Sequence, residues 1–288
     1  MKSILVSTLL TLSAAVLINS VSHAQDDMSS LKGPYLGQTP PGMTPEVFAP
    51  GIISTQGWEY GVVFAPSMKE VYWVREINAD TEPEQQFVMY EQRGNKWHER
   101  VIGKRRGTPT LSIDGKVMFF GRAYKERTPD GWSELKRLGP DFEDIRIMRV
   151  TESAKGTIVF DEAKNNSVLR ISRLTGGERE TPKPLPAEIN TGELNAHPFI
   201  APDESYIIWD GQRDSDIRNA DLFISFKQAD NSWGEAIKFG DSINTPSNEF
   251  ASHVTPDGKY LFFNRKMGPD NIDTFWVDAQ VIEVLRPK

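Results

Sequence analysis

Oppositely charged side chains placed at matched distances on either side of a turn can form an ion pair or hold a charged ligand. A Pro256-Asp257-Gly258 turn lies between two extended apolar runs, the pattern of a β-hairpin. If the turn is a three-residue loop, Thr255 faces Lys259. Counting outward along the two strands then places Glu249 opposite Arg265.

The same counting predicts two further pairs in earlier parts of the chain. Glu59 is expected opposite Arg75, and Arg146 opposite Glu162, with the charges exchanged in the second pair. A ligand site needs one sign of charge at a given place, whereas an ion pair within one structural unit tolerates either orientation. We therefore interpret these three pairs as structural.

One hairpin unit breaks this pattern, because the two facing positions that hold opposite charges in the other units hold like charges here. Arg106 is expected to face Arg122, with Lys104 and Arg105 adjacent and no acid within the unit. Such a basic cluster could bind a carboxylate, a sulfate or an acidic partner, and the alternative is a cluster that only contacts solvent.

His197 and His253 lie on neighbouring predicted strands and point to the same side by period-two counting. We predict that they are ligand-binding residues together with Arg106 and Arg122. A metal would need three or four convergent ligands, and Glu193 or Glu249 near the histidines does not guarantee them, so no metal is expected. No phosphate-binding glycine loop or Ser/His/Asp arrangement is evident, and we expect no cofactor.

These residues belong to a hairpin unit that recurs five times, at intervals of about 40 to 55 residues. Each copy has an aromatic residue at the same distance beyond the start of its turn. The turns begin at Pro66, Ile113, Ser153, Pro202 and Pro256, and the aromatic residues are Trp73, Phe120, Phe160, Trp209 and Phe263. We interpret the aromatic residues as packing between units, because one small sheet cannot bury both of its faces alone.

The predicted fold is therefore all-β: a β-propeller of four-stranded blades, with five blades favoured and six possible. We expect one propeller domain at 46–288, preceded by an extended arm at 25–45 that packs against or joins the last blade to close the ring. The apolar segment 280–285 is the expected outer strand of that last blade.

The turn Thr255-Pro-Asp-Gly-Lys-Tyr-Leu-Phe-Phe, followed by Asp273-Thr-Phe-Trp-Val, resembles the WD40-like (PD40) repeat of TolB-type propeller proteins. The resemblance covers nearly all of 46–285 and implies a propeller fold. The α/β domain that precedes the propeller in TolB has no counterpart here, and neither does the hydrolase domain of prolyl-oligopeptidase-like enzymes.

The first residues have the pattern of a cleaved export signal. A basic start is followed by an apolar run and by Ser22-His23-Ala24, so we place a signal peptide at 1–24 with cleavage after Ala24. The run is too short to span a membrane. The chain has no cysteine, and its formal net charge of −7 argues against nucleic acid as a partner. We expect a periplasmic or secreted protein.

These observations together favour an exported, monomeric, non-enzymatic binding module. Its propeller face or channel mouth would hold a protein or a small anionic or glycan ligand. The alternative is a carbohydrate-active enzyme, a glycosidase or lyase, that uses channel carboxylates such as Glu193, Glu249 and Asp210. A scaffold subunit is a third possibility.

Overall fold

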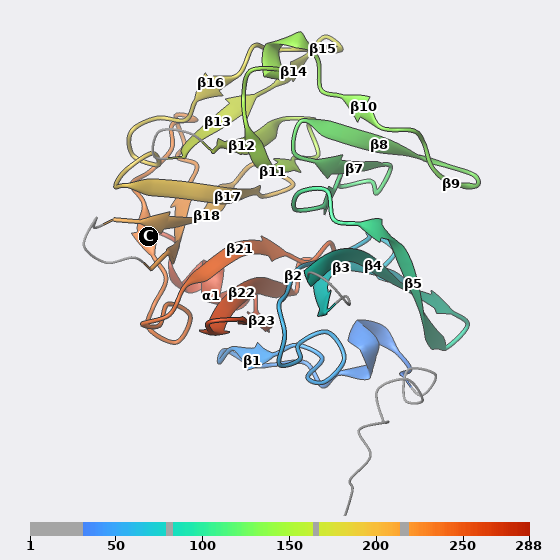
Figure 1. Ribbon diagram of the computed structural model, residues 1–288. Helices are drawn as coiled ribbons and strands as arrows, with labels where there is room; N and C mark the ends of the chain where they lie inside the picture. Colours follow the sequence, from blue (N-terminus) through green and yellow to red (C-terminus); the bar gives the residue numbers. More distant parts are fainter. Residues whose placement is uncertain (1–30, 79–82, 164–166, 214–218) are drawn as a thin grey trace, which may run out of the picture.

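Five antiparallel sheets surround a central axis in the computed structural model, which describes residues 31–78, 83–163, 167–213 and 219–288 (Figure 1). The predicted five-bladed β-propeller is confirmed. The predicted signal peptide lies outside the described residues. Within them, no helix is long and apolar enough to cross a membrane.

Each blade is numbered in chain order, and its strands are given from the channel outward. Blade 1 contains β2 (Glu59–Phe64), β3 (Glu70–Asn78), β4 (Pro83–Arg93) and β5 (Lys96–Lys104). Blade 2 contains β6 (Thr110–Leu111), β7 (Val117–Phe120), β8 (Ala123–Thr128) and β10 (Lys136–Arg137), and the short β9 (Gly131–Trp132) also pairs with β8. Blade 3 contains β11 (Ile147–Glu152), β12 (Ile158–Glu162), β13 (Val168–Ser172) and β16 (Lys183–Pro184).

The remaining elements complete the ring. A side ribbon next to blade 3 is formed by β14 (Leu174–Thr175) and β15 (Glu178–Arg179). Blade 4 contains β17 (Leu194–Ile200), β18 (Tyr206–Gln212), β19 (Asp221–Phe226) and β20 (Ile237–Lys238). Blade 5 contains β21 (Glu249–Val254), β22 (Tyr260–Gly268), β23 (Asn271–Asp278) and β1 (Glu46–Val47). The helical segments are α1 (Gln280–Val284) and the 3-10 helices Pro34–Gly37 and Pro140–Phe142.

The outer strand of the last blade comes from the N-terminal side of the chain. In the ladder, Glu46 pairs with Trp276 and Val47 with Phe275, so β1 lies beside β23 (Figure 1). The expectation that 280–285 forms this strand was wrong, because Gln280–Val284 is the helix α1. Its apolar residues Val281 and Ile282 are buried against the core of blades 4 and 5 instead.

The arm before β1 contacts both blades that meet at the closure. The Tyr35 hydroxyl donates a hydrogen bond of 2.5 Å to Asp257 in the turn between β21 and β22 of blade 5. In blade 1, the Trp97 indole N–H donates to the Gly33 carbonyl at 2.9 Å. The arm therefore fastens the first blade to the last.

The repeated aromatic residues pack between blades, as predicted. Trp73 lies in one buried cluster with Phe262 and Trp276 of blade 5, and Trp209 packs with apolar residues of blade 3. Both indoles are about 1% exposed or less. Each aromatic residue thus fills the space toward the preceding blade.

The hairpin turn is longer than predicted, but a second irregularity compensates for it. The Thr255 N–H donates to the Tyr260 carbonyl, so Thr255 is paired with Tyr260 and not with Lys259. Farther along β21, the register shifts at a β-bulge between Phe250 and His253. The extra residue in the turn shifts the register of the two strands by one residue, and the extra residue in the bulge shifts it back.

Because of this cancellation, Glu249 does lie opposite Arg265, and Glu59 lies opposite Arg75 in the equivalent place. Arg265 Nε donates to Glu249 Oε1 at 2.7 Å, and the Glu249 side chain is fully buried. Arg75 instead forms its ion pair with Glu99 on β5 at 2.8 Å. Glu59 accepts hydrogen bonds from Thr55.

The third predicted pair was wrong. Blade 3 has a shorter turn, in which the Ser153 N–H donates to the Thr157 carbonyl, and the whole register moves. Glu162 lies opposite Ile147 and forms its ion pair with Arg170 on β13 at 2.6 Å. Arg146 is left at the end of β11, with an exposed side chain.

Polar side chains on the second strand of three blades clamp the bulge of the next blade. Asp161 accepts the His197 N–H at 2.9 Å, Asp210 accepts the Ala251 N–H at 2.9 Å, and Asn264 accepts the Gly61 N–H at 3.3 Å. The three donor residues have positive φ angles of 45°, 53° and 70°. These bonds join blades 3 to 4, 4 to 5 and 5 to 1.

Asp161→Asn tests this clamp, because Asp161 is fully buried and also accepts the N–H groups of Met148 and Arg149. An amide group would leave at least one buried N–H unpaired, so we expect the free energy of unfolding in urea to fall by about 2 kcal/mol. Asp144→Asn, at an exposed position, is the control. Equal stability of the two variants would contradict the clamp.

Arg265→Met tests the ion pair with Glu249. Removal of one partner of a buried pair leaves the other without compensation, so we expect a loss of about 3 kcal/mol. Arg106→Met removes an exposed arginine and should change the free energy of unfolding by no more than about 0.5 kcal/mol. Chemical denaturation of both variants decides whether the pair stabilises the fold.

Candidate functional site

The central channel is hollowed at both ends. The inner strands of all five blades line one hollow, whereas blade 2 contributes to the other through the segment that precedes β6. One cavity, which we call the turn-side cavity, has a volume of about 190 Å³ and lies beside the hairpin turns. The other, the far mouth, has about 370 Å³. Arg149 lines the turn-side cavity and the preceding Met148 lines the far mouth, so the channel is divided at this level.

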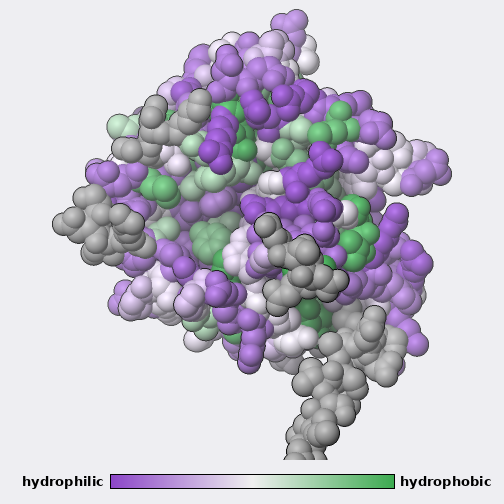
Figure 2. Space-filling view, viewed as in Figure 1, coloured by the Kyte–Doolittle hydropathy of each residue, from purple (hydrophilic) through white to green (hydrophobic). Residues whose placement is uncertain are grey.

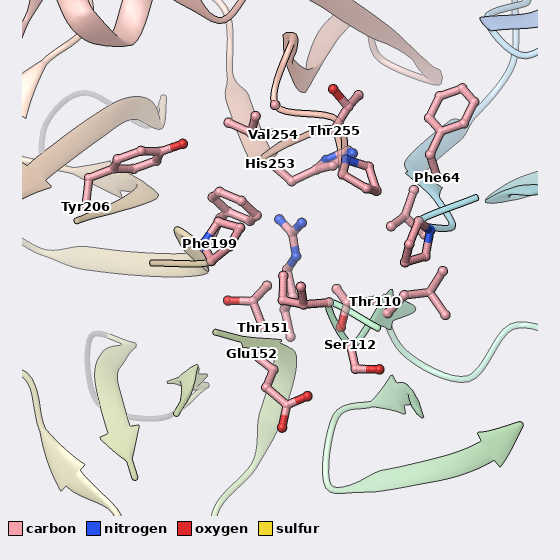
Figure 3. Close-up of a pocket in the computed structure, with 18 residues that line it drawn as sticks. Phe64, Thr110, Ser112, Thr151, Glu152, Phe199, Tyr206, His253, Val254 and Thr255 are labelled. Carbon is pink, nitrogen blue, oxygen red and sulfur yellow. The ribbon is translucent and has the colours of Figure 1, made fainter. Parts of the chain in front are cut away.

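The turn-side cavity has mostly apolar walls and a few polar groups. Phe64, Phe199 and Val254 come from three different inner strands, and Figure 3 shows them around the same space as His253 and Thr151. Thr110 and Ser112 face it from blade 2. Enclosed cavities with apolar walls and a few convergent polar groups are typical of small-molecule sites.

Arg149 is the cationic side chain of this cavity, and it is only 3% exposed. Its Nη1 donates to the Ser252 carbonyl at 3.0 Å and to the His197 carbonyl at 3.4 Å. Its Nε has no hydrogen-bond partner, and it forms no ion pair with any residue that the structure describes. Burial lowers the pKa of Arg149 to about 10, against the opposing effect of Asp210 and Asp161, so the guanidinium stays protonated at neutral pH.

His253 lines the same cavity and is neutral. Burial, and then the charge of Arg149, lower the pKa of the imidazole to about 3. Its Nε2 has no hydrogen-bond partner within the described residues. The cavity therefore contains one permanent cation and one neutral imidazole with an unused ring nitrogen.

The lining residues of the turn-side cavity include one carboxylate, Glu152. Its carboxylate points away from the centre of the cavity in Figure 3, and Arg179 Nη2 lies 3.6 Å from it. Of the three acids expected to serve an enzyme, Glu249 is bound to Arg265, and Asp210 to His197 and the Ala251 N–H. Glu193 has an exposed side chain.

The far mouth holds the second predicted histidine. His197 Nδ1 lies 3.1 Å from Asp210 Oδ1, and its side chain is 19% exposed. His197 and His253 therefore line different cavities and do not form one site. No group of three or more His, Asp or Glu side chains in the described part of the chain could hold a metal ion.

The predicted basic cluster of blade 2 does not form as expected. Arg106 and Arg122 lie beyond the ends of β6 and β7, so no ladder pairing places them face to face. Arg122 donates to the Glu143 carbonyl. Lys104 does have an acidic partner, Glu84, at 2.9 Å.

Sequence reasoning missed Arg149, and a signal for it was present. The side chain stands between Met148 and Val150 in a predicted strand, and arginine is almost never buried without a partner or a function. The turn of blade 3 was predicted in the wrong place. Arg146 was therefore assigned to an ion pair, and Arg149 was given no role.

Comparison with known proteins shows the fold alone. The catalytic domain of a GH62 α-L-arabinofuranosidase from Coprinopsis cinerea has a TM-score of 0.51 and 9% identity, over 83% of this chain and 97% of that one. TolB from Acinetobacter baumannii (TM-score 0.47, 13% identity) matches over 76% of this chain, which spans about half of the TolB chain (54%). A gluconolactonase from Xanthomonas campestris (TM-score 0.47, 11% identity) matches over 78% of this chain and 86% of that one.

What the arabinofuranosidase domain shares with this chain is the fold. No protein-family model matches the chain, and no curated protein matches it. The resemblance to TolB-type PD40 repeats therefore remains a prediction for the family, although the fold that it implied is present.

The low pKa of His253 predicts acid sensitivity. In the unfolded chain this histidine takes up a proton below about pH 6.5, whereas in the folded protein it stays neutral down to about pH 3. The unfolded state therefore binds more protons, and folding loses up to about 1.4 kcal/mol for each pH unit below 6.5.

His253→Gln removes this effect and leaves His197 in place. We expect the stability of the native protein relative to the variant to fall by about 2 kcal/mol between pH 6.5 and pH 5. Urea denaturation of both proteins across this range is the measurement. Parallel pH profiles would show that His253 takes up its proton in the folded state.

Proposed function

We propose that this protein is an exported, non-enzymatic binding module that holds a small organic carboxylate in the turn-side cavity. The observation that carries the proposal is Arg149, a buried cation whose Nε has no partner and which forms no ion pair with a described residue. Arginine binds carboxylates through charge-assisted hydrogen bonds, which are stronger than bonds between neutral groups.

The energetics favour an anion over a neutral ligand. A buried charge without a counter-ion is costly, and the two backbone carbonyls that Arg149 contacts compensate it only in part. Asp161 and Asp210 lower the potential at the guanidinium, but their oxygens accept backbone N–H groups and the His197 ring instead. A carboxylate that reaches Nε would supply the missing partner.

The walls indicate what the rest of the ligand is like. Phe64, Phe199 and Val254 favour an apolar or aromatic body. The volume of about 190 Å³ is slightly larger than a cavity of about 150 Å³ that holds benzene, which limits the enclosed part to a small ring or short chain. The threonine and serine hydroxyls at the cavity already donate to other protein groups, so they offer no free donor to a polar substituent.

The enzyme alternative has less support from these residues. A glycosidase generally uses a pair of carboxylates about 5 to 10 Å apart, and Glu152 is the one carboxylate among the residues that line this cavity. Export is proposed from the predicted signal peptide at 1–24.

Isothermal titration with benzoate tests the proposal, with benzamide as the neutral probe of the same shape. We expect benzoate to bind and Arg149→Met to weaken it by about 10- to 100-fold, the loss of one charge-assisted hydrogen bond. Arg106→Met is the control and should leave binding unchanged, because Arg106 is exposed and does not line the cavity.

Stability must be measured on the same samples, since Arg149→Met also leaves two carbonyls without a donor. Phe199→Leu is a second variant, which keeps the charge of Arg149 and removes one aromatic ring from the cavity wall. It should weaken the binding of benzoate more than the binding of acetate. If benzamide binds as well as benzoate, or if neither probe binds, the carboxylate site is excluded.

A further inference from the structure

The far mouth is a second cavity, and its chemistry differs from that of the turn-side cavity. Trp58 and Tyr60 from blade 1, His197 from blade 4 and Phe250 from blade 5 form an aromatic wall. The Tyr60 and Phe250 ring centres are 6.4 Å apart, and those of His197 and Phe250 are 6.1 Å apart. Two arginines, Arg105 and Arg146, line the same space.

Arg105 is held in place by the wall itself. Its guanidinium carbon lies 5.4 Å from the centre of the Trp58 ring and 5.0 Å from that of Tyr60. Its Nη1 donates to the Gln85 side chain at 2.7 Å and its Nε to the Gly107 carbonyl at 3.2 Å. These partners are all neutral groups, and they fix the position of the guanidinium before any ligand arrives.

Arg146 reaches the far mouth because of the register of blade 3. With Glu162 bound to Arg170, the acid that was expected to neutralise Arg146 is used elsewhere. The backbone carbonyl of Arg146 accepts the Ala163 N–H, which anchors the main chain at the rim. Its exposed side chain adds a second positive charge.

His197 adds a third charge at lower pH. Burial lowers the pKa of its imidazole and Arg149 lowers it further, but Asp210 and Asp161 have the larger combined effect, and the pKa is raised above its ordinary value. In the protonated form both ring nitrogens are donors, and Nδ1 is already engaged with Asp210.

A buried donor at the same place lacks a partner. Tyr60 is 4% exposed, and its hydroxyl lies beside Arg105 and Thr108 but meets hydrogen-bond geometry with no described residue. The nearby carboxylates do not compensate the arginines, because Asp161 accepts backbone N–H groups and Asp210 accepts the His197 ring and the Ala251 N–H.

We propose that the far mouth is a second binding site, for a tetrahedral oxyanion such as the phosphate or sulfate group of a small molecule. Arg105, Arg146 and His197 supply charge, and the Tyr60 hydroxyl supplies a further donor. A doubly charged group with several acceptor oxygens matches two arginines and a third, titratable cation better than a single carboxylate does. This site shares no lining residue with the turn-side cavity.

Titration calorimetry with inorganic sulfate tests the site, with acetate as the singly charged comparison. We expect sulfate to bind more tightly than acetate and Arg146→Gln to weaken sulfate by about tenfold, since one charge-assisted contact is lost. Arg106→Gln is the matched control: it removes an equally exposed arginine of the same rim that does not line the cavity. Equal effects of the two variants would reveal only a diffuse positive surface and overturn the proposal.

The pH dependence supplies an independent readout. Sulfate keeps its charge between pH 5.5 and pH 8.5, so a change in affinity reports on the protein. We expect the affinity to rise by about tenfold as the pH falls through the His197 pKa. His197→Asn should abolish this dependence, because an amide does not take up a proton in this pH range. The variant should keep the local structure, since the amide can still donate to Asp210 and asparagine tolerates the positive φ of 45°. A pH-independent affinity for sulfate in the native protein would overturn the proposal.

Inorganic phosphate, titrated at pH 8.5 where it is also doubly charged, distinguishes a site for phosphate groups from a site for sulfate groups. Tighter binding of phosphate assigns the site to phosphate esters, and tighter binding of sulfate assigns it to sulfate esters. Failure of both anions to bind would overturn this site alone, because benzoate binding at Arg149 is measured separately. Circular dichroism and urea denaturation of each variant confirm that it is folded.

Discussion

Three of the five blade junctions depend on one repeated interaction, the acceptance of a bulge N–H by a carboxylate or amide oxygen of the preceding blade. Asp161, Asp210 and Asn264 each reach from a second strand into the next inner strand. A β-bulge exposes an N–H that its own ladder cannot satisfy, and burying it unpaired would cost about 1–3 kcal/mol. The contact therefore stabilises the bulge and fixes the angle between blades at the same time.

The bulges also decide what the channel presents. Positive φ values at His197 and Ala251 change the direction of the strand, and the carbonyls of His197 and Ser252 become acceptors for Arg149. The side chain of His197 lines one cavity, while His253, two residues beyond the bulge of β21, lines the other. Hydrophilic residues cover most of the face seen in Figure 2, and apolar ones show only in small separate areas. The bulges of β17 and β21 therefore determine which side chains line the two candidate sites.

Most of the fold could be predicted from the sequence, and the site could not. Turn residues and aromatic spacing are local signals that recur in each blade, and they gave the blade number. The ladder position of Glu249 was also predicted, but through two errors that cancel: a turn that ends at Tyr260 and not at Lys259, and a bulge that no residue pattern announces. Blade 3 has a shorter turn, so there the errors do not cancel. Arg146 was consequently given the wrong role and Arg149 was missed, since side chains one or two residues apart on a strand face different neighbours.

The pairing of β1 with β23 ties residues made early in synthesis to residues made late. During translation the fifth blade stays one strand short, with the edge of β23 unpaired, until the arm folds back across almost the whole length of the chain. Contacts between segments so distant in sequence form slowly, because the intervening chain must first be brought together. Completion of the circle is therefore expected to be the last step of folding.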